Sequence, residues 1–147
     1  GIVPANTKIT KKRVIGNFLN KALIKKSIDL LDSGRQERAW LYIGDCVVMM
    51  LNILLHGKSF IYNVGGEELV SIKRLAEMIC DLTDAKHSLP GGADEVFMTG
   101  APDRVRLDIS KAKNEFQLDD FTDLKEGLRR TIEWNKEFIR KHNIKIV

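Results

Sequence analysis

Residues 38–66 read RAWLYIGDCVVMMLNILLHGKSFIYNVGG, and three patterns follow one another within this stretch. Residues 38–43 are rich in aromatic and branched side chains, which is typical of a strand. An apolar block then runs to residue 56, and Asp45 at its start can cap a helix. Residues 60–64 have the composition of a buried strand and stop at a glycine pair. A strand, a helix and a second strand in succession predict a fold of the α/β class.

Amphipathic helices are predicted on both sides of this stretch, because apolar residues recur there every three or four positions. The predicted helices span about residues 11–26, 71–82, 110–116 and 123–142, and Ser71 is expected to cap the second of them. Residues 104–107 are expected to be extended. Helices thus alternate with few short strands, and irregular loops separate them. We expect a mixed α/β or α+β piece rather than a complete doubly wound sheet.

Composition predicts one globular domain, since the 147 residues are 44% hydrophobic and 30% charged. Residues 1–12 have no period and are predicted to be a loop or a cut edge, so the domain is expected to span residues 13–147. Cys46 and Cys80 lie in apolar helical patterns, which indicates small core residues in a reducing compartment. The longest apolar run is far shorter than the ~20 residues of a membrane span, and the start has no secretory signal. A cytoplasmic protein without membrane contact is expected.

The formal charge of +4 at pH 7 is mild, because acidic residues are interleaved with basic ones along the chain. This balance suits an anionic small ligand at least as well as nucleic acid. The basic residues near the start lie beside an apolar helix face and include no aromatic platform, so we interpret them as a solvated face and expect no nucleic-acid partner. They are Lys8, Lys11, Lys12, Arg13, Lys21, Lys25 and Lys26.

A reaction centre is not recognisable in this sequence. Gly65-Gly66 follows a predicted strand, but no third glycine stands at the spacing of a dinucleotide fingerprint, so the pair is interpreted as a turn. Neither tyrosine is followed by a lysine four positions later, as an acid–base pair of this kind would require. The three histidines are scattered, and no metal site is predicted. We therefore expect no catalytic residue, no metal ligand and no cofactor-binding residue in this chain.

Several polar side chains do stand at the ends of predicted elements. Arg38 precedes a strand, Asn63 ends one, and Arg104 follows a Gly-Ala-Pro turn. The planar guanidinium fork suits the paired oxygens of a diphosphate, and an amide can bond a sugar hydroxyl or a base edge. The alternative is that both arginines are ordinary surface or ion-paired residues.

Read in order, five groups of residues resemble the C-terminal half of the extended short-chain dehydrogenase/reductase family, whose members act on nucleotide sugars. The match runs from residue 13 to about residue 138 in the right order and spacing. The groups are RVIGNF at 13–18, LDSG at 31–34 with RAWLYIGD at 38–45, IYNVGG at 61–66 with VSI at 70–72, GAPDR at 100–104 with DISKAK at 108–113, and the helix at 124–134.

The resemblance implies that this region packs against the C-terminal edge of a Rossmann domain and closes over a nucleotide-diphosphate sugar. It implies that Arg38 contacts the diphosphate and that Asn63 lies near the nucleotide. It also implies that Arg104 reaches the phosphates or the base, and that Asn17 sits near the diphosphate or the sugar. The substrate-binding residues expected on this basis are Asn17, Arg38, Asn63 and Arg104.

In this family the glycine fingerprint and the Tyr-x-x-x-Lys pair stand upstream of every motif present here. The resemblance therefore implies that NAD is bound by the enzyme's own N-terminal Rossmann domain, which is absent from this chain, and that the chain alone binds no cofactor and is not active. A homodimer formed largely through the absent half is common in the family. The first interpretation is thus the substrate-binding part of an NAD-dependent epimerase, dehydratase or decarboxylase. The alternative is a non-enzymatic nucleotide-sugar-binding or protein-docking module without a catalytic half.

Overall fold

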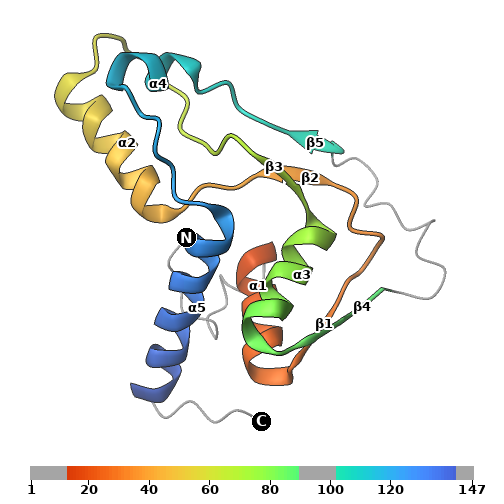
Figure 1. Cartoon of the computed structure of the whole chain (residues 1–147). Helices are drawn as coiled ribbons and strands as arrows, with labels where there is room; N and C mark the ends of the chain where they lie inside the picture. Colours follow the sequence, from red (N-terminus) through yellow and green to blue (C-terminus); the bar gives the residue numbers. More distant parts are fainter. Residues whose placement is uncertain (1–12, 90–101, 142–147) are drawn as a thin grey trace.

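The computed structural model describes residues 13–89 and 102–141 (Figure 1). The predicted loop at residues 1–12, the glycine-rich loop after residue 89 and the last residue of the predicted final helix lie outside these ranges. The elements in chain order are α1 (Val14–Asn20), the π-helical turn η2 (Lys21–Lys25), β1 (Ser27–Asp29), β2 (Glu37–Ala39), α2 (Ile43–His56), β3 (Leu69–Ser71), α3 (Ile72–Thr83), β4 (Lys86–Ser88), β5 (Arg104–Val105), α4 (Ser110–Phe116) and α5 (Leu124–Lys141).

The described strands are short and form two small sheets. β1 pairs with β4 in parallel. In the other sheet the order is β3-β2-β5, with β2 antiparallel to β3 and parallel to β5. In β2, Arg38 stands opposite Val70 of β3 on one edge and opposite Val105 of β5 on the other. The prediction of a mixed α/β fold with few short strands is confirmed.

Two hydrophobic clusters hold the chain together. The larger cluster joins α1, η2, β1, α3 and α5, and Leu75, Ala76 and Ile79 on the inner face of α3 are fully buried in it. The smaller cluster joins α2 and the start of α4 through Met49, Ile109 and Ala112. Figure 1 shows these groups as two regions, with α1, α3 and α5 in the lower part and α2 and α4 at the upper left. The sheet of β2, β3 and β5 lies between them.

Helix positions follow the local sequence signals closely. The predicted Ser71 cap of α3 is confirmed, since its Oγ accepts a hydrogen bond of 3.1 Å from Arg74 N. α4 spans the predicted residues, and the backbone amide of Ser110 at its start donates to Asp108 Oδ1 at 2.9 Å. The predicted first helix begins later, at residue 14, and its last turn is π-helical.

The prediction that Asp45 caps a helix is wrong. α2 begins at Ile43, which places Asp45 in its first turn and ends the predicted strand 38–43 at residue 39. The Asp45 carboxylate instead accepts hydrogen bonds from Thr122 N at 2.8 Å and from Thr122 Oγ1 at 3.0 Å. The carboxylate thus bonds to Thr122, which is distant in the sequence, and not to backbone amides of its own helix. The Asp45–Thr122 pair links α2 to the residues just before α5.

Residues 60–64 do not form the predicted buried strand. The segment pairs with none of the described strands, and Phe60 and Ile61 are 107% and 77% exposed. Its side chains nevertheless alternate, because Tyr62 and Val64 pack against the smaller cluster while Ile61 and Asn63 are exposed. The sequence pattern is that of a strand, but the described residues offer this segment no neighbour to pair with.

The sequence also predicted that the two cysteines are small core residues and that the chain has no membrane span. Both cysteines are free thiols, and Cys80 is buried in the larger cluster. Among the described residues, no helix has both the length and the apolar character that a membrane crossing needs.

Gly66 allows two backbone segments to touch, and this contact can be tested. A Cβ on Gly66 would lie 1.9 Å from the carbonyl oxygen of Trp40, whereas a Cβ on Gly65 would meet only side-chain atoms, at 3.5 Å or more. We expect Gly66→Ala to lower the free energy of unfolding by about 1–3 kcal/mol, because backbone must shift. Gly65→Ala should change it by less than about 0.5 kcal/mol. Urea unfolding of both variants measures the difference, and equal losses would contradict this contact.

Candidate functional site

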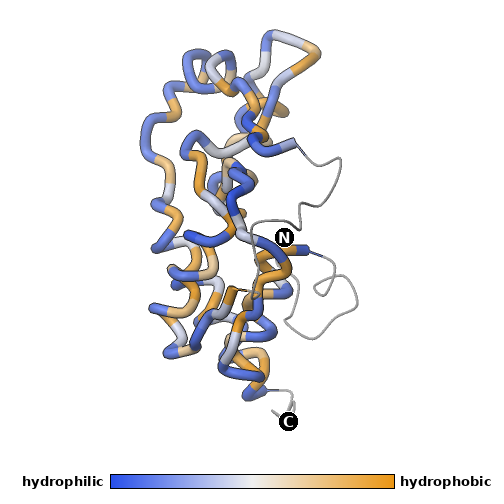
Figure 2. The backbone as a smooth tube through the Cα atoms, turned by 90° about the vertical axis from the view of Figure 1, so that its right-hand side faces the viewer, coloured by the Kyte–Doolittle hydropathy of each residue, from blue (hydrophilic) through white to orange (hydrophobic). Residues whose placement is uncertain are grey.

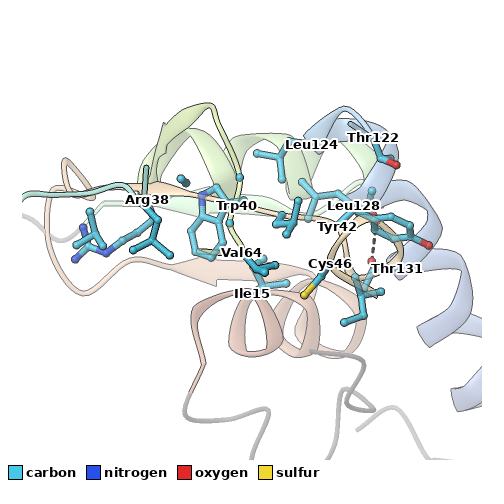
Figure 3. A pocket seen from close by; sticks show the side chains of 18 residues that line it. Ile15, Arg38, Trp40, Tyr42, Cys46, Val64, Thr122, Leu124, Leu128 and Thr131 are labelled. Carbon is cyan, nitrogen blue, oxygen red and sulfur yellow. Dashed lines mark hydrogen bonds between the residues drawn. The ribbon is translucent and has the colours of Figure 1, made fainter. Parts of the chain in front are cut away.

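A cavity of about 410 Å³ opens between the chain that leaves β2 and the first turns of α5. One wall is formed by residues 38–43 and the facing wall by residues 64–66, while Leu124, Leu128 and Thr131 approach from α5 (Figure 3). Most lining side chains are apolar. The volume and the apolar lining with few polar groups are those of a small-molecule site.

The two facing walls are close because of their glycines. Gly66 carries no side chain, so its backbone lies directly against the backbone of Trp40. On the α5 side, Gly127 lies against the Tyr42 ring, where an added Cβ would be 3.2 Å from a ring carbon. These contacts fix Trp40 and Tyr42 in the cavity wall, where Figure 3 shows both side chains.

Electrostatic contacts hold the Tyr42 end of the cavity. The guanidinium of Arg130 lies over the Tyr42 ring, 5.5 Å from its centroid, in a cation–π arrangement. Arg130 also donates to Glu126 Oε1 at 2.7 Å. Hydrogen bonds from Arg129 and then Arg130 lower the pKa of Glu126 to about 2. The carboxylate therefore stays charged at neutral pH and keeps Arg130 in place above the ring.

Arg38 is the only charged side chain among the described residues that line the cavity. It is half-buried. Its Nη1 donates to the carbonyl oxygens of Glu37 and Asp103, at 2.7 and 3.3 Å. Within the described part of the chain, Nε and Nη2 have no acceptor. An arginine anchored by one nitrogen, with two more unused, can receive an anion with paired oxygens.

The other three predicted site residues do not line the cavity. In the pairing of β2 with β5, Arg104 stands opposite Glu37, and its Nε lies 2.7 Å from Glu37 Oε2. Successive residues of a strand point to opposite faces, so Arg104 and Arg38 lie on different faces of the sheet. Asn63 Nδ2 donates to the carbonyl oxygen of Asp108 at 2.8 Å. Asn17 lies within α1, which contributes Ile15 to the cavity instead.

Sequence reasoning missed several lining residues, namely Trp40, Tyr42, Thr122 and Thr131. The alternation Arg38-x-Trp40-x-Tyr42 was a usable signal for the first two, because large side chains at every second position mark one face of an extended segment. No local signal pointed to Thr122 or Thr131. Thr131 lies on a helix far along the chain, and its Oγ1 donates to Gly127 O at 2.7 Å.

The described residues were also compared with two kinds of reaction centre, a metal site and a dinucleotide cradle. No described set of three or more His, Cys, Asp or Glu side chains is grouped as metal ligands would be. Gly65-Gly66 does not form a pyrophosphate cradle either, because Gly66 is packed against the Trp40 backbone and the next element is a strand, β3. The pair itself is not assigned as a turn, and a bend follows it at residues 67–68. Among the described residues, Arg38 is thus the one charged side chain beside an apolar cavity.

Known proteins resemble this chain both in sequence and in fold. Residues 3–65 match the model of the NAD dependent epimerase/dehydratase family. The chain is 31% identical to UDP-glucuronic acid decarboxylase 1 of Danio rerio over 125 residues, which are 83% of this chain and 28% of that protein. It is 32% identical to an uncharacterised UDP-glucose epimerase of Bacillus subtilis (strain 168) over 119 residues, 78% of this chain and 36% of that protein.

Solved structures show the same fold. UDP-glucuronic acid 4-epimerase from Bacillus cereus, in complex with UDP-glucuronic acid and NAD, superposes with a TM-score of 0.70 at 24% identity, over 87% of this chain and 41% of that one. An epimerase from Methanothermobacter thermautotrophicus gives 0.73 at 24% identity, over 88% and 39%. The fold is thus that of Rossmann-type sugar epimerases and dehydratases.

The family match, the curated relatives and the fold agree with one another, and the chain belongs to the extended short-chain dehydrogenase/reductase family of NAD-dependent nucleotide-sugar epimerases and dehydratases. It spans about a third of the length of these two curated relatives, 28% and 36%.

The Asp45–Thr122 pair positions α5 beside the cavity, and it predicts a graded series of stabilities. Asp45→Ala removes both hydrogen bonds and leaves the Thr122 amide without its acceptor, so we expect the free energy of unfolding to fall by about 1–3 kcal/mol. Thr122→Val removes only the hydroxyl bond and should cost less. Thr122→Ser keeps both donors and should be close to wild type. Urea unfolding of the three variants measures this order, and a Thr122→Ser loss as large as that of Asp45→Ala would contradict it.

Proposed function

We propose that this chain is the nucleotide-sugar-binding part of an NAD-dependent epimerase, dehydratase or decarboxylase. The observation that carries the proposal is the Arg38 guanidinium, which is anchored through Nη1 beside an apolar cavity of about 410 Å³. A diphosphate would take the two unused nitrogens, and the attached groups would extend along the apolar lining. The names of the relatives, which include UDP-glucuronic acid decarboxylase 1 and UDP-glucose epimerase, support a nucleotide sugar as the ligand.

The contact proposed for Arg104 needs a change of partner. Arg104 would leave its ion pair with Glu37, in which the arginine side chain is 70% exposed. Exposed ion pairs are worth only ~0.2–1 kcal/mol, so a phosphate group can compete with this carboxylate. We also propose that Asn63 contacts the nucleotide and that Asn17 contacts the diphosphate or the sugar, as the family resemblance implies.

The role proposed for this region is to hold the substrate while the chemistry is done elsewhere. Because the chain's own glycine pair cannot cradle a dinucleotide, NAD would be bound by an N-terminal Rossmann domain, where it would supply oxidation and reduction of the sugar. Interactions made here with the remote nucleotide would position the reacting sugar and so affect rate as well as affinity. We further propose that the whole enzyme is a cytoplasmic isomerase or lyase and forms a homodimer.

The test measures nucleotide-sugar and NAD binding by calorimetry on the complete gene product, with UDP-glucose and dTDP-glucose as probes. Arg38→Ala should weaken binding of the nucleotide sugar about 10- to 100-fold, because a hydrogen bond to a charged group contributes ~1.5–3 kcal/mol. NAD binding should be nearly unchanged. Arg38→Lys should restore only part of the affinity, since an ammonium group lacks the planar fork.

Arg74→Ala serves as the matched control. Arg74 is an exposed arginine of α3 that pairs with Glu77 and does not line the cavity. If Arg38→Ala loses no more affinity than this control, or loses NAD binding instead, the placement of the diphosphate at Arg38 is wrong.

A second function is favoured by a different observation, the apolar side chains that remain exposed on α2. A non-enzymatic module that binds a nucleotide sugar or docks onto another protein would need no reaction centre. The same calorimetry separates the two proposals. Binding of a nucleotide sugar without any binding of NAD by the complete gene product would favour the module.

A further inference from the structure

The first residue pair of the β2–β5 ladder brings three charged side chains together. Glu37 stands opposite Arg104 in this ladder, and Arg38 is the next residue of β2. The Arg104 Nε lies 2.7 Å from Glu37 Oε2, while Arg38 Nη1 donates to the carbonyl oxygen of Glu37 at 2.7 Å. Both guanidinium groups are thus attached to Glu37, one through its carboxylate and the other through its backbone.

The two guanidinium groups also meet on the β5 side of the ladder. Asp103 immediately precedes Arg104, and its carbonyl oxygen accepts hydrogen bonds from Glu37 N at 2.7 Å and from Arg38 Nη1 at 3.3 Å. Hydrophilic stretches, blue in Figure 2, are spread over the described chain and do not gather in one region. The meeting of two arginines with one glutamate is therefore a local feature of this ladder and not part of a broad polar face.

The Arg104 side chain has room to leave Glu37. It is 70% exposed, and β5 is an edge strand in the described sheet, whose order is β3-β2-β5. Arg104 and Arg38 lie on opposite faces of this sheet, but no further described strand separates the two faces at this edge. A long, exposed side chain can therefore turn round the edge toward an anion held by Arg38.

We propose that Glu37 sets the affinity of the site, because its carboxylate competes with the ligand's diphosphate for Arg104. The inference rests on the proposed function, which places the diphosphate at Arg38. A carboxylate and a phosphate group both offer paired oxygens to a guanidinium, so they exclude one another. Part of the binding free energy is used to break the Glu37–Arg104 pair, and the ligand binds more weakly than it would without Glu37.

A purely structural role of the pair predicts the opposite effect. The Glu37–Arg104 pair also joins β5 to β2, and Val105 of β5 and the nearby Leu107 line the cavity. If the pair served only to hold this wall, its removal would loosen the wall and weaken ligand binding. The sign of the change in affinity therefore separates competition from support.

The test is calorimetry on the complete gene product with UDP-glucose and dTDP-glucose as probes. Glu37→Gln should bind the nucleotide sugar about 2- to 5-fold more tightly, which corresponds to the contribution of an exposed ion pair. Affinity equal to or below that of the wild type would overturn the proposal. The substituted side chain is not buried, so the circular dichroism spectrum should be unchanged.

Glu77→Gln is the matched control for the change in charge. Glu77 pairs with Arg74 on α3 and does not line the cavity. The exposures of the two pairs are similar, at 60% and 29% for Arg74 and Glu77 and at 70% and 35% for Arg104 and Glu37. Glu77→Gln should leave the affinity unchanged, and tightening equal to that of Glu37→Gln would overturn the proposal.

A double-mutant cycle shows whether Glu37 acts through Arg104. In an Arg104→Ala background there is no pair to break, so the tightening caused by Glu37→Gln should be at most half of that seen with Arg104 present. Direct repulsion between Glu37 and the ligand predicts a different result, since this charge would be left unpaired. Tightening that is equal or larger in the Arg104→Ala background would overturn the proposal.

Inorganic pyrophosphate separates this inference from the function on which it rests, because it carries two phosphate groups without sugar or base. Tighter pyrophosphate binding by Glu37→Gln, with no binding of either nucleotide sugar, would support the competition and overturn the proposed function. Nucleotide-sugar binding that Glu37→Gln does not tighten would do the reverse. Failure of the wild type to bind any of these probes would overturn both.

Discussion

Strand β2 is bonded along both of its edges, to β3 and to β5, and this constraint decides where the polar groups of the site lie. Because a strand turns successive side chains to opposite faces, Glu37 and Arg38 cannot share a face. Glu37 meets Arg104 across the β5 edge, while Arg38 is left beside the cavity. The position of Arg38 beside the cavity therefore depends on the register of a strand only three residues long.

The chain that follows β2 forms part of the cavity beside Arg38. Residues 40–43 continue as the cavity wall, and Gly66 lets the opposite wall approach the Trp40 backbone. The Asp45–Thr122 bonds then bring the start of α5 against the same cavity. Two contacts between segments distant in the sequence thus enclose the space beside Arg38. One of them involves Trp40, which packs against the larger hydrophobic cluster.

The parts of this structure that could be predicted from sequence are those governed by local interactions. The apolar spacing of α3 and its Ser71 cap, and the extent of α4, depend on neighbours within one or two turns. Asp45 was misassigned because a distant threonine competes for its carboxylate. Residues 60–64 were misassigned because composition indicates a strand, whereas no described strand pairs with this segment. In the site, the chemistry of Arg38 indicated an anion, whereas Trp40, Thr122 and Thr131 come together only through tertiary packing. Family resemblance supplied Asn17, while Asn63 and Arg104 were also singled out by their place at the ends of predicted elements. None of the three lines the cavity.

The most direct measurement of the central claim is a crystal structure of the complete gene product with UDP-glucose or dTDP-glucose bound. The account predicts diphosphate oxygens within about 2.7–3.2 Å of Arg38 Nε and Nη2, with the ligand extending into the cavity between residues 38–43 and α5. A ligand bound with its diphosphate remote from Arg38, or a cavity that stays empty at saturating ligand while the protein binds it elsewhere, would contradict the account.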